Sequence, residues 1–114
     1  MSKYYSRRTK CNSLHNHASI KEANRCNELT LMEKGGRITH LKQQPRLELR
    51  EAFLFQGEKI RKIEYVADFS YFDVDTKMWC IEDTKGFKTE IYKLKIKLLK
   101  FIMRNAEDIL FIES

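Results

Sequence analysis

The chain has 114 residues, of which 42% are hydrophobic and 33% are charged, so a single domain with a modest core is expected. It contains no run of 18 apolar residues, which excludes a long apolar membrane-spanning helix, and its first residues lack the apolar stretch of a secretory signal. Its three cysteines are odd in number, which excludes a fully paired disulfide framework and favours reduced thiols. We therefore expect a cytoplasmic protein without a membrane partner.

The positive charge is concentrated in the first half of the chain. The net charge is +6. Residues 1–50 contain 11 Lys and Arg against 4 Asp and Glu, or +7, whereas residues 51–114 contain 11 against 12, or −1. A basic segment beside a locally acidic site suits a polyanionic substrate, although a merely basic protein would show the same balance. Residues 1–18 are interpreted as a basic N-terminal arm and residues 19–114 as one domain.

The first predicted helix is followed by a series of extended segments. Ser19 and Glu22 have the spacing of a capping box. Gly35 and Gly36 follow as a stop signal, so a helix is expected over residues 19–34. Alternating apolar residues then predict strands that are separated by polar turns. The first expected strand begins at residue 38, is interrupted at Pro45 and continues over residues 47–50. The second and third cover residues 63–69 and 78–84, and the expected turns cover residues 56–59 and 73–77.

A second helix and a last strand complete the predicted order. Thr89 is expected to cap a helix over residues 90–104, and residues 109–112 form a short apolar strand. One apolar stripe of this helix is expected to face the core. The stripe consists of Ile91, Leu94, Leu98, Leu99 and Ile102. The order of helix, three strands, helix and strand predicts an α/β protein built in layers.

Acidic residues and a lysine stand at the ends of two predicted strands. Asp68 ends one apolar run, and Asp83 and Lys85 end the next. Residues two apart on a strand face the same side, so Asp83 and Lys85 should project together and meet Asp68, while Glu82 should face the opposite side. Grouped charges are costly to desolvate, but carboxylates hold Mg²⁺ and a lysine can stabilise charge on a phosphate. An exposed ion pair leaving the sheet is the alternative interpretation.

These motifs, in this order, resemble those of the PD-(D/E)XK nuclease superfamily, and the chain looks like a small phage-borne, Holliday-junction-resolvase-like branch of it. Ala67 stands where many members have a proline. The resemblance implies a restriction-endonuclease-like αβββαβ core, with a mixed central sheet flanked by helices. The matching segments are residues 19–23, 41–45, 65–69, 82–86 with Thr89, and 92–98.

The resemblance also implies the roles of individual residues. Asp68 resembles the principal ligand of Mg²⁺ or Mn²⁺, and Asp83 resembles the second acidic ligand, with the carbonyl group of Thr84 completing the site. Lys85 resembles the catalytic lysine. Glu22 resembles an additional acidic residue of the metal site, although its spacing from Ser19 is equally satisfied by a capping role.

Two cysteines and two histidines near the N-terminus form a further candidate site. Cys11, His15, His17 and Cys26 could bind a structural Zn²⁺ ion tetrahedrally. Their spacing is not that of a standard zinc finger, and Cys26 lies on a predicted helix face where a free cysteine is common in the core. Core packing is therefore the competing interpretation for Cys26.

Together these features predict a metal-dependent endodeoxyribonuclease that hydrolyses phosphodiester bonds in branched or four-way-junction DNA. One small domain has no separate module for reading base sequence, which favours recognition of DNA shape. The resemblance implies a homodimer and a phage or prophage protein in a bacterial cytoplasm. The alternatives are a non-catalytic nucleic-acid-binding protein that retains the nuclease fold, and a phage assembly factor. DNA contacts are expected from Arg7, Arg8, Lys10, Gln44, Lys93, Lys97 and Lys100, although a solvated helix face would also explain the last three.

Overall fold

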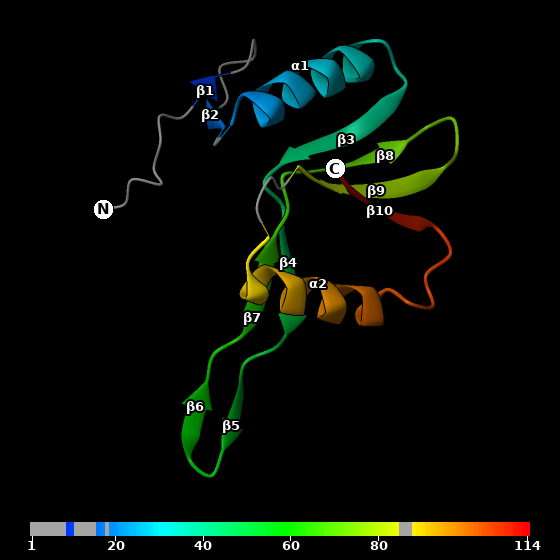
Figure 1. Cartoon of the computed structure of the whole chain (residues 1–114). Coiled ribbons are helices and arrows are strands. Elements are labelled where there is room, and N and C mark those ends of the chain that lie inside the picture. The colour runs from blue at the N-terminus through cyan, green and yellow to red at the C-terminus, as the bar shows by residue number, and fades with distance from the viewer. Residues whose placement is uncertain (1–8, 11–15, 18, 85–87) are drawn as a thin grey trace.

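A computed structural model describes residues 9–10, 16–17, 19–84 and 88–114, and of the first two segments only the backbone. Figure 1 shows the arrangement of the elements. In chain order they are β1 (Thr9–Lys10), β2 (Asn16–His17), α1 (Ile20–Lys34), β3 (Ile38–Gln43), β4 (Arg46–Arg50), β5 (Phe53–Phe55), β6 (Glu58–Ile60), β7 (Ile63–Val66), β8 (Phe69–Asp73), β9 (Met78–Asp83), α2 (Glu90–Ile102) and β10 (Ile109–Glu113).

The central sheet has the strand order β10-β9-β8-β3. Strand β8 is antiparallel to both β3 and β9, whereas β10 is parallel to β9. The parallel pair requires a crossover, and α2 provides it. Helix α1 lies on one side of the sheet and α2 on the other (Figure 1). The chain is therefore an α/β protein with a mixed sheet and flanking helices, as the sequence predicts.

Helix α1 and the first core cluster form as the sequence predicts. The side chain of Ser19 accepts a hydrogen bond from the backbone N–H of Glu22, and the helix stops at Gly35. Ala23, Cys26 and Leu29 recur every three residues, so they form one buried stripe. This stripe packs against the sheet face that carries Phe69, Ile38, Tyr71 and Cys80, where Phe69 and Ile38 are completely buried.

The buried face of α2 differs from the predicted apolar stripe. Tyr92, Ile96 and Leu99 are the buried residues of this helix, whereas Ile91, Leu94 and Ile102 are exposed. The helix is rotated so that the Tyr92 ring reaches the core and its hydroxyl group meets a carboxylate of β10. The prediction was right for Leu98 and Leu99, which pack in the second core cluster, and wrong for the other three residues, because a tyrosine can bury its ring and still satisfy its hydroxyl group.

The strand predicted over residues 63–69 is divided into β7 and β8, which belong to different sheets. At the division, the backbone N–H of Asp68 donates to the carbonyl group of Glu82 (3.0 Å), and the N–H of Gln44 donates to the carbonyl group of Asp68 (2.8 Å). Gln44 has a φ angle of 52°, which lies in the left-handed region. The chain therefore leaves the central sheet at Gln44 and rejoins it at Asp68.

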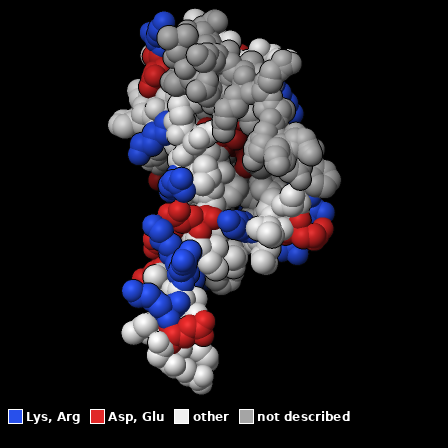
Figure 2. Space-filling view, turned by 90° about the vertical axis from the view of Figure 1, so that its left-hand side faces the viewer, with Lys and Arg blue, Asp and Glu red and all other residues white. Residues whose placement is uncertain are grey.

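Between Gln44 and Asp68, the strand pairs β4–β7 and β5–β6 form a long hairpin arm that extends away from the central sheet (Figure 1). Gln56 and Gly57 form its turn, close to the predicted position, and both have positive φ angles. Figure 2 shows Lys and Arg side chains along this arm and mostly uncharged atoms at its tip. Neither helix in the described ranges is long and apolar enough to cross a membrane.

Candidate functional site

Asp68 and Asp83 are brought together by the pairing of β8 and β9. The antiparallel register of β8 and β9 ends at the pair Phe69–Glu82. Asp68 immediately precedes β8 and donates its backbone N–H to the carbonyl group of Glu82, which places it beside the end of β9 that carries Asp83. Asp68 is 8% exposed and Asp83 is completely buried. In Figure 2, Asp or Glu atoms are visible deep in a hollow of the upper half of the molecule. Asp68 and Asp83 therefore lie at neighbouring strand ends, and their shared role in a metal site stays a prediction.

Thr84 fixes the carboxylate of Asp68. The backbone N–H and the side-chain hydroxyl group of Thr84 both donate hydrogen bonds to Oδ2 of Asp68, each at 2.7 Å. Hydrogen bonds to a charged acceptor are stronger than neutral ones, so they fix the orientation of this carboxylate. Both bonds go to Oδ2, so these contacts leave the second oxygen, Oδ1, to act as an acceptor or metal ligand as far as the described residues are concerned. The sequence resemblance implied a role for the Thr84 carbonyl group, whereas these contacts use its N–H and hydroxyl groups.

Tyr65 of β7 holds the carboxylate of Asp83. Its hydroxyl group donates a hydrogen bond to Oδ2 of Asp83. The neighbouring Tyr92 of α2 has its ring centroid 6.1 Å from that of Tyr65, and its hydroxyl group donates to Glu113 at 2.5 Å. Burial, and then the hydrogen bond to Asp83, raise the pKa of Tyr65 well above its usual value. This tyrosine therefore remains a hydrogen-bond donor to Asp83 over the whole physiological pH range.

The tyrosines lead to a testable pH dependence of stability. Burial is the first cause of the raised pKa of Tyr65, Tyr71 and Tyr92. Since an unfolded tyrosine titrates near pH 10, their contribution is complete below about pH 10 and is lost as the pH rises towards their folded pKa values. We expect the free energy of unfolding, measured by urea titration, to fall above about pH 10. The fall should be less steep for Tyr65→Phe, and identical slopes would contradict this assignment.

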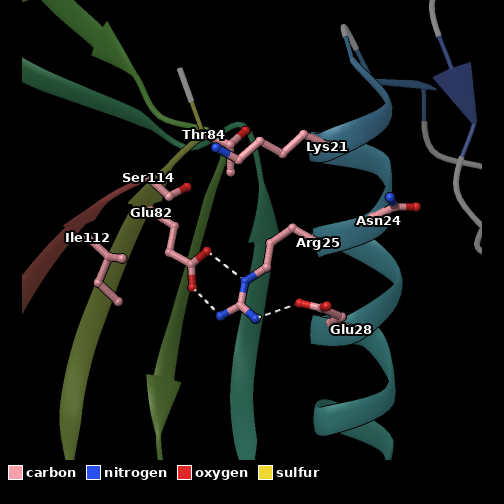
Figure 3. Close-up of a pocket in the computed structure, with 8 residues that line it drawn as sticks. All are labelled: Lys21, Asn24, Arg25, Glu28, Glu82, Thr84, Ile112 and Ser114. Atoms are coloured by element: carbon pink, nitrogen blue, oxygen red, sulfur yellow. Dashed lines mark hydrogen bonds and ion pairs between the residues drawn. The ribbon is translucent and has the colours of Figure 1, made fainter. Parts of the chain in front are cut away.

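Glu82 faces the opposite side of β9, as strand alternation predicts, and joins α1 to the sheet. Arg25 of α1 donates from Nε and Nη2 to the two carboxylate oxygens of Glu82, at 2.8 and 2.6 Å, and from Nη1 to Glu28 at 2.9 Å (Figure 3). The hydroxyl group of Tyr71 also donates to Glu82. The side chain of Glu82 is only 4% exposed. This buried ion pair fixes the helix that carries Glu22 against the strand that carries Asp83.

The predicted basic face of α2 is present. Lys93, Lys97 and Lys100 are exposed and, with Lys88, line an open groove of about 540 Å³ between α2 and the end of β10. Lys88 lies 3.5 Å from the carboxylate of Glu113, whose pKa is lowered mainly by the hydrogen bond from Tyr92. Tyr92 also lines this groove and contacts Tyr65. The groove is therefore on the same side of the sheet as Asp83.

Of the remaining predicted site residues, three are described by the structure and the others are not. Glu22 is buried, with 4% exposure, in the first turn of α1. Cys26 is completely buried, and its thiol lies 3.7 Å from the side-chain oxygen of Gln43, as core packing would predict. Gln44 is exposed beside Asp68. The following predicted residues lie outside the described residues or have an undescribed side chain: Arg7, Arg8, Lys10, Cys11, His15, His17 and Lys85.

The facing carboxylates fit a hard divalent cation. In proteins Mg²⁺ is commonly held by one or two carboxylates, with waters and substrate phosphates completing its octahedron. Both Asp68 and Asp83 raise the pKa of Tyr65 by their charge, so both lie near the same hydroxyl group. Two buried carboxylates at one point repel each other, and a bound cation would relieve that repulsion. In the described part of the chain, no three Asp, Glu, His or Cys side chains form a metal-binding group, and the role of Glu22 stays a prediction.

Sequence analysis missed the groups that hold these carboxylates in place. Tyr65 is two residues before Ala67 on a strand that was expected to be continuous, and its contact with Asp83 depends on the packing of the hairpin arm. Arg25 has the helical spacing to share a face with Glu22 and Glu28, a pattern that the sequence does display. Its partner Glu82 is 57 residues away in the chain and could be identified only from the fold.

The chain matches a known family, but the description of that family names no activity. The chain belongs to a family described as "Protein of unknown function (DUF1064)", because the model of that family matches residues 1–113. No curated protein and no solved structure matches the chain. The function is therefore inferred from the fold and from the chemistry of the site.

Proposed function

We propose that this protein is a divalent-metal-dependent DNA endonuclease with a restriction-endonuclease-like core. The observation that carries the proposal is the pairing of β8 with β9, together with the hydrogen bonds of Asp68 to Glu82 and Thr84, which hold the buried Asp68 beside the strand end that carries the buried Asp83. Two carboxylates on adjacent strand ends are the ligands that a Mg²⁺ or Mn²⁺ ion requires. The basic groove on α2 supplies the positive charge that a DNA backbone requires.

The order of the elements supports this core. Without the hairpin arm and the N-terminal strands, the chain reads α1, β3, β8, β9, α2 and β10, which is the αβββαβ order of the superfamily that the sequence resembles. The arm is an insertion between the first two strands of that order. Asp68 lies where the arm rejoins the sheet, and Asp83 lies at the end of the next strand.

Each residue of the proposed site has its own chemical role. Asp68 and Asp83 would hold the ion, with Thr84 and Tyr65 fixing their orientation through the hydrogen bonds described above. When bound, Mg²⁺ or Mn²⁺ would neutralise phosphate charge and lower the pKa of a water molecule. Lys85, which lies outside the described residues, is proposed from its spacing to orient the water that attacks the phosphorus in line and to stabilise the developing charge.

The proposed substrate is branched DNA. The chain is one small domain without a separate module for reading base sequence, and its basic groove on α2 is short, which favours recognition by backbone shape. By the same resemblance we propose action on four-way junctions and an origin as a phage protein in a bacterial cytoplasm. The proposed zinc site would fix the N-terminal arm to α1 through Cys26, in competition with the core packing of that thiol.

A cleavage assay tests the proposal. Junction, flap, linear duplex and single-stranded DNA should be offered in parallel with Mg²⁺, Mn²⁺ or EDTA. We expect cleavage with either metal, preference for branched substrates, and no cleavage in EDTA. One competing function is a nucleic-acid-binding protein without turnover, which the basic groove on α2 would equally serve. Salt-dependent DNA binding without cleavage under any metal would establish that alternative.

We further propose that the protein is a homodimer that associates through the tip of its hairpin arm. Phe53, Leu54 and Phe55 of β5 are 40%, 71% and 55% exposed. A two-stranded hairpin that stands alone is marginally stable in water, and a second copy would cover these side chains and extend the strands.

Substitution of Phe55 should dissociate this dimer. Phe55→Lys removes an apolar ring but places a lysine opposite Glu58, so the hairpin keeps a favourable cross-strand pair. We expect light scattering to report a dimer for the wild type and a shift of the dissociation constant by roughly tenfold or more for the variant. Val74→Lys, at an equally apolar but separate exposed position, is the control. An unchanged dissociation constant for Phe55→Lys would exclude the arm as the interface.

A further inference from the structure

A second pocket lies beside Asp68, on the α1 side of the sheet. It has a volume of about 350 Å³, and one wall is α1 while the other is formed by the ends of β9 and β10 (Figure 3). This volume lies within the range of small-molecule and ligand-group sites in proteins. The lining residues are Lys21, Asn24, Arg25, Glu28, Glu82, Thr84, Ile112 and Ser114.

The charges of this pocket are unevenly distributed. At one end, Arg25 is bound by the carboxylates of Glu82 and Glu28, at 2.6 and 2.9 Å, so this ion-pair group offers no uncompensated positive charge. At the other end, Lys21 extends from α1 towards Thr84 (Figure 3). Within residues 19–84 and 88–114, Lys21 takes part in no ion pair, and it is exposed. The end of the pocket beside Thr84 is therefore positive and polar.

The chemistry of this end suits an oxyanion. The ammonium group of Lys21 lies beside Thr84, whose own hydroxyl group is bound to Asp68, and Ser114 lines the same pocket. An ammonium group at close range is a common phosphate ligand, acting as a point charge. A ligand in this end would be separated from Asp68 by a single residue, Thr84.

We propose that this pocket binds a phosphate group of the DNA strand next to the phosphate that is cut, with Lys21 as its main contact. The inference rests on the proposed nuclease function and deepens it, because it assigns a backbone contact on the side of the sheet opposite the basic groove of α2. Contacts on both sides of the catalytic carboxylates would fix the strand in register before cleavage. Lys21 is then a binding residue that positions the substrate.

The test measures DNA binding separately from cleavage. In an Asp83→Asn background and in EDTA, the dissociation constant for a labelled junction should be measured at several salt concentrations for Lys21→Ala, Lys21→Arg and Lys34→Ala. Lys34 is an exposed lysine in the last turn of the same helix and is the matched control. We expect Lys21→Ala to weaken binding roughly tenfold and to lower the salt slope by about 0.9, while Lys21→Arg retains both.

Each outcome has a defined meaning. Equal affinities and slopes for Lys21→Ala and Lys34→Ala would overturn the phosphate pocket, even if the wild type cuts DNA. If Lys21→Ala lowers the salt slope of DNA binding but the wild type never cuts DNA, the result would support the phosphate pocket and refute the nuclease proposal. Thermal unfolding of each variant separates misfolding from lost contact, and an exposed lysine should change the unfolding midpoint little. Loss of binding by Lys21→Arg as well would show that charge at this position is insufficient and would contradict the proposed contact.

Discussion

Replacing Asp83 with asparagine should lower the rate of DNA cleavage by roughly a thousandfold or more. The substitution keeps the shape of the side chain and an oxygen that can accept the hydrogen bond of Tyr65, but it removes the charge that holds a divalent ion. A metal that stabilises phosphate charge contributes several kcal/mol to the transition state, and about 4 kcal/mol corresponds to a factor of about a thousand in rate. Single-turnover cleavage of a labelled junction in Mg²⁺ is the appropriate measurement.

Two controls make this experiment specific. Glu82→Gln changes the neighbouring residue on the opposite face of β9 and tests whether any loss of charge near the strand end has the same effect. It should reduce cleavage far less than Asp83→Asn, after correction for the folded fraction. Asp68→Asn should match Asp83→Asn, because the two carboxylates are proposed to hold one ion. If Asp83→Asn cuts as fast as the wild type, the carboxylate pair is not the catalytic site.

Replacing Arg25 with alanine should destabilise the fold by about 3–5 kcal/mol, the usual cost of removing one partner of a buried ion pair. The side chain of Glu82 would then be buried with only the hydroxyl group of Tyr71 as a described partner. The free energy of unfolding, from urea titration at neutral pH, is the quantity to compare.

An exposed ion pair provides the contrast for this prediction. Arg37 lies 3.8 Å from Asp75, and both side chains are 67% exposed. Arg37→Ala should therefore change the free energy of unfolding by no more than about 0.5 kcal/mol. A double-mutant cycle with Arg25→Ala and Glu82→Gln should give a coupling energy well above that value. A coupling energy as small as that of an exposed pair would show that Arg25 and Glu82 do not hold α1 to the sheet.

The local features of the fold could be predicted because each depends on residues close in sequence. The capping of α1 by Ser19 and its end at Gly35 follow from residue type and spacing. The turn before Met78 and the alternation that sends Glu82 and Asp83 to opposite faces follow from strand geometry. For the same reason the meeting of Asp68 and Asp83 could be expected from two strand ends and the turn between them.

The features that could not be predicted depend on contacts between distant segments. The division of residues 63–69 into two strands requires the hairpin arm to leave the sheet, which is set by its packing against α2. The rotation of α2 depends on a tyrosine whose hydroxyl partner, Glu113, is 21 residues later. Trp79 lies in an apolar stretch of sequence but is 41% exposed, and its ring contacts those of Phe72 and His40.

The two acidic strand ends were recognisable in sequence, whereas their supporting groups were not. A carboxylate beside a D-x-K pattern can be found by spacing, but Tyr65, Arg25 and Tyr71 reach their partners from other elements. Such supporting residues determine how rigidly the carboxylates are held, and therefore how well a site can discriminate among metal ions.

A crystal structure of the protein soaked with Mn²⁺ tests the central claim most directly. We predict an anomalous scattering peak about 2.2 Å from carboxylate oxygens of both Asp68 and Asp83, since divalent ions of this size bind oxygen ligands at about 2.0–2.6 Å. The same soak of Asp83→Asn should lack the peak. A well-occupied peak elsewhere, with none between these two residues, would contradict the proposed metal site and the nuclease function built on it.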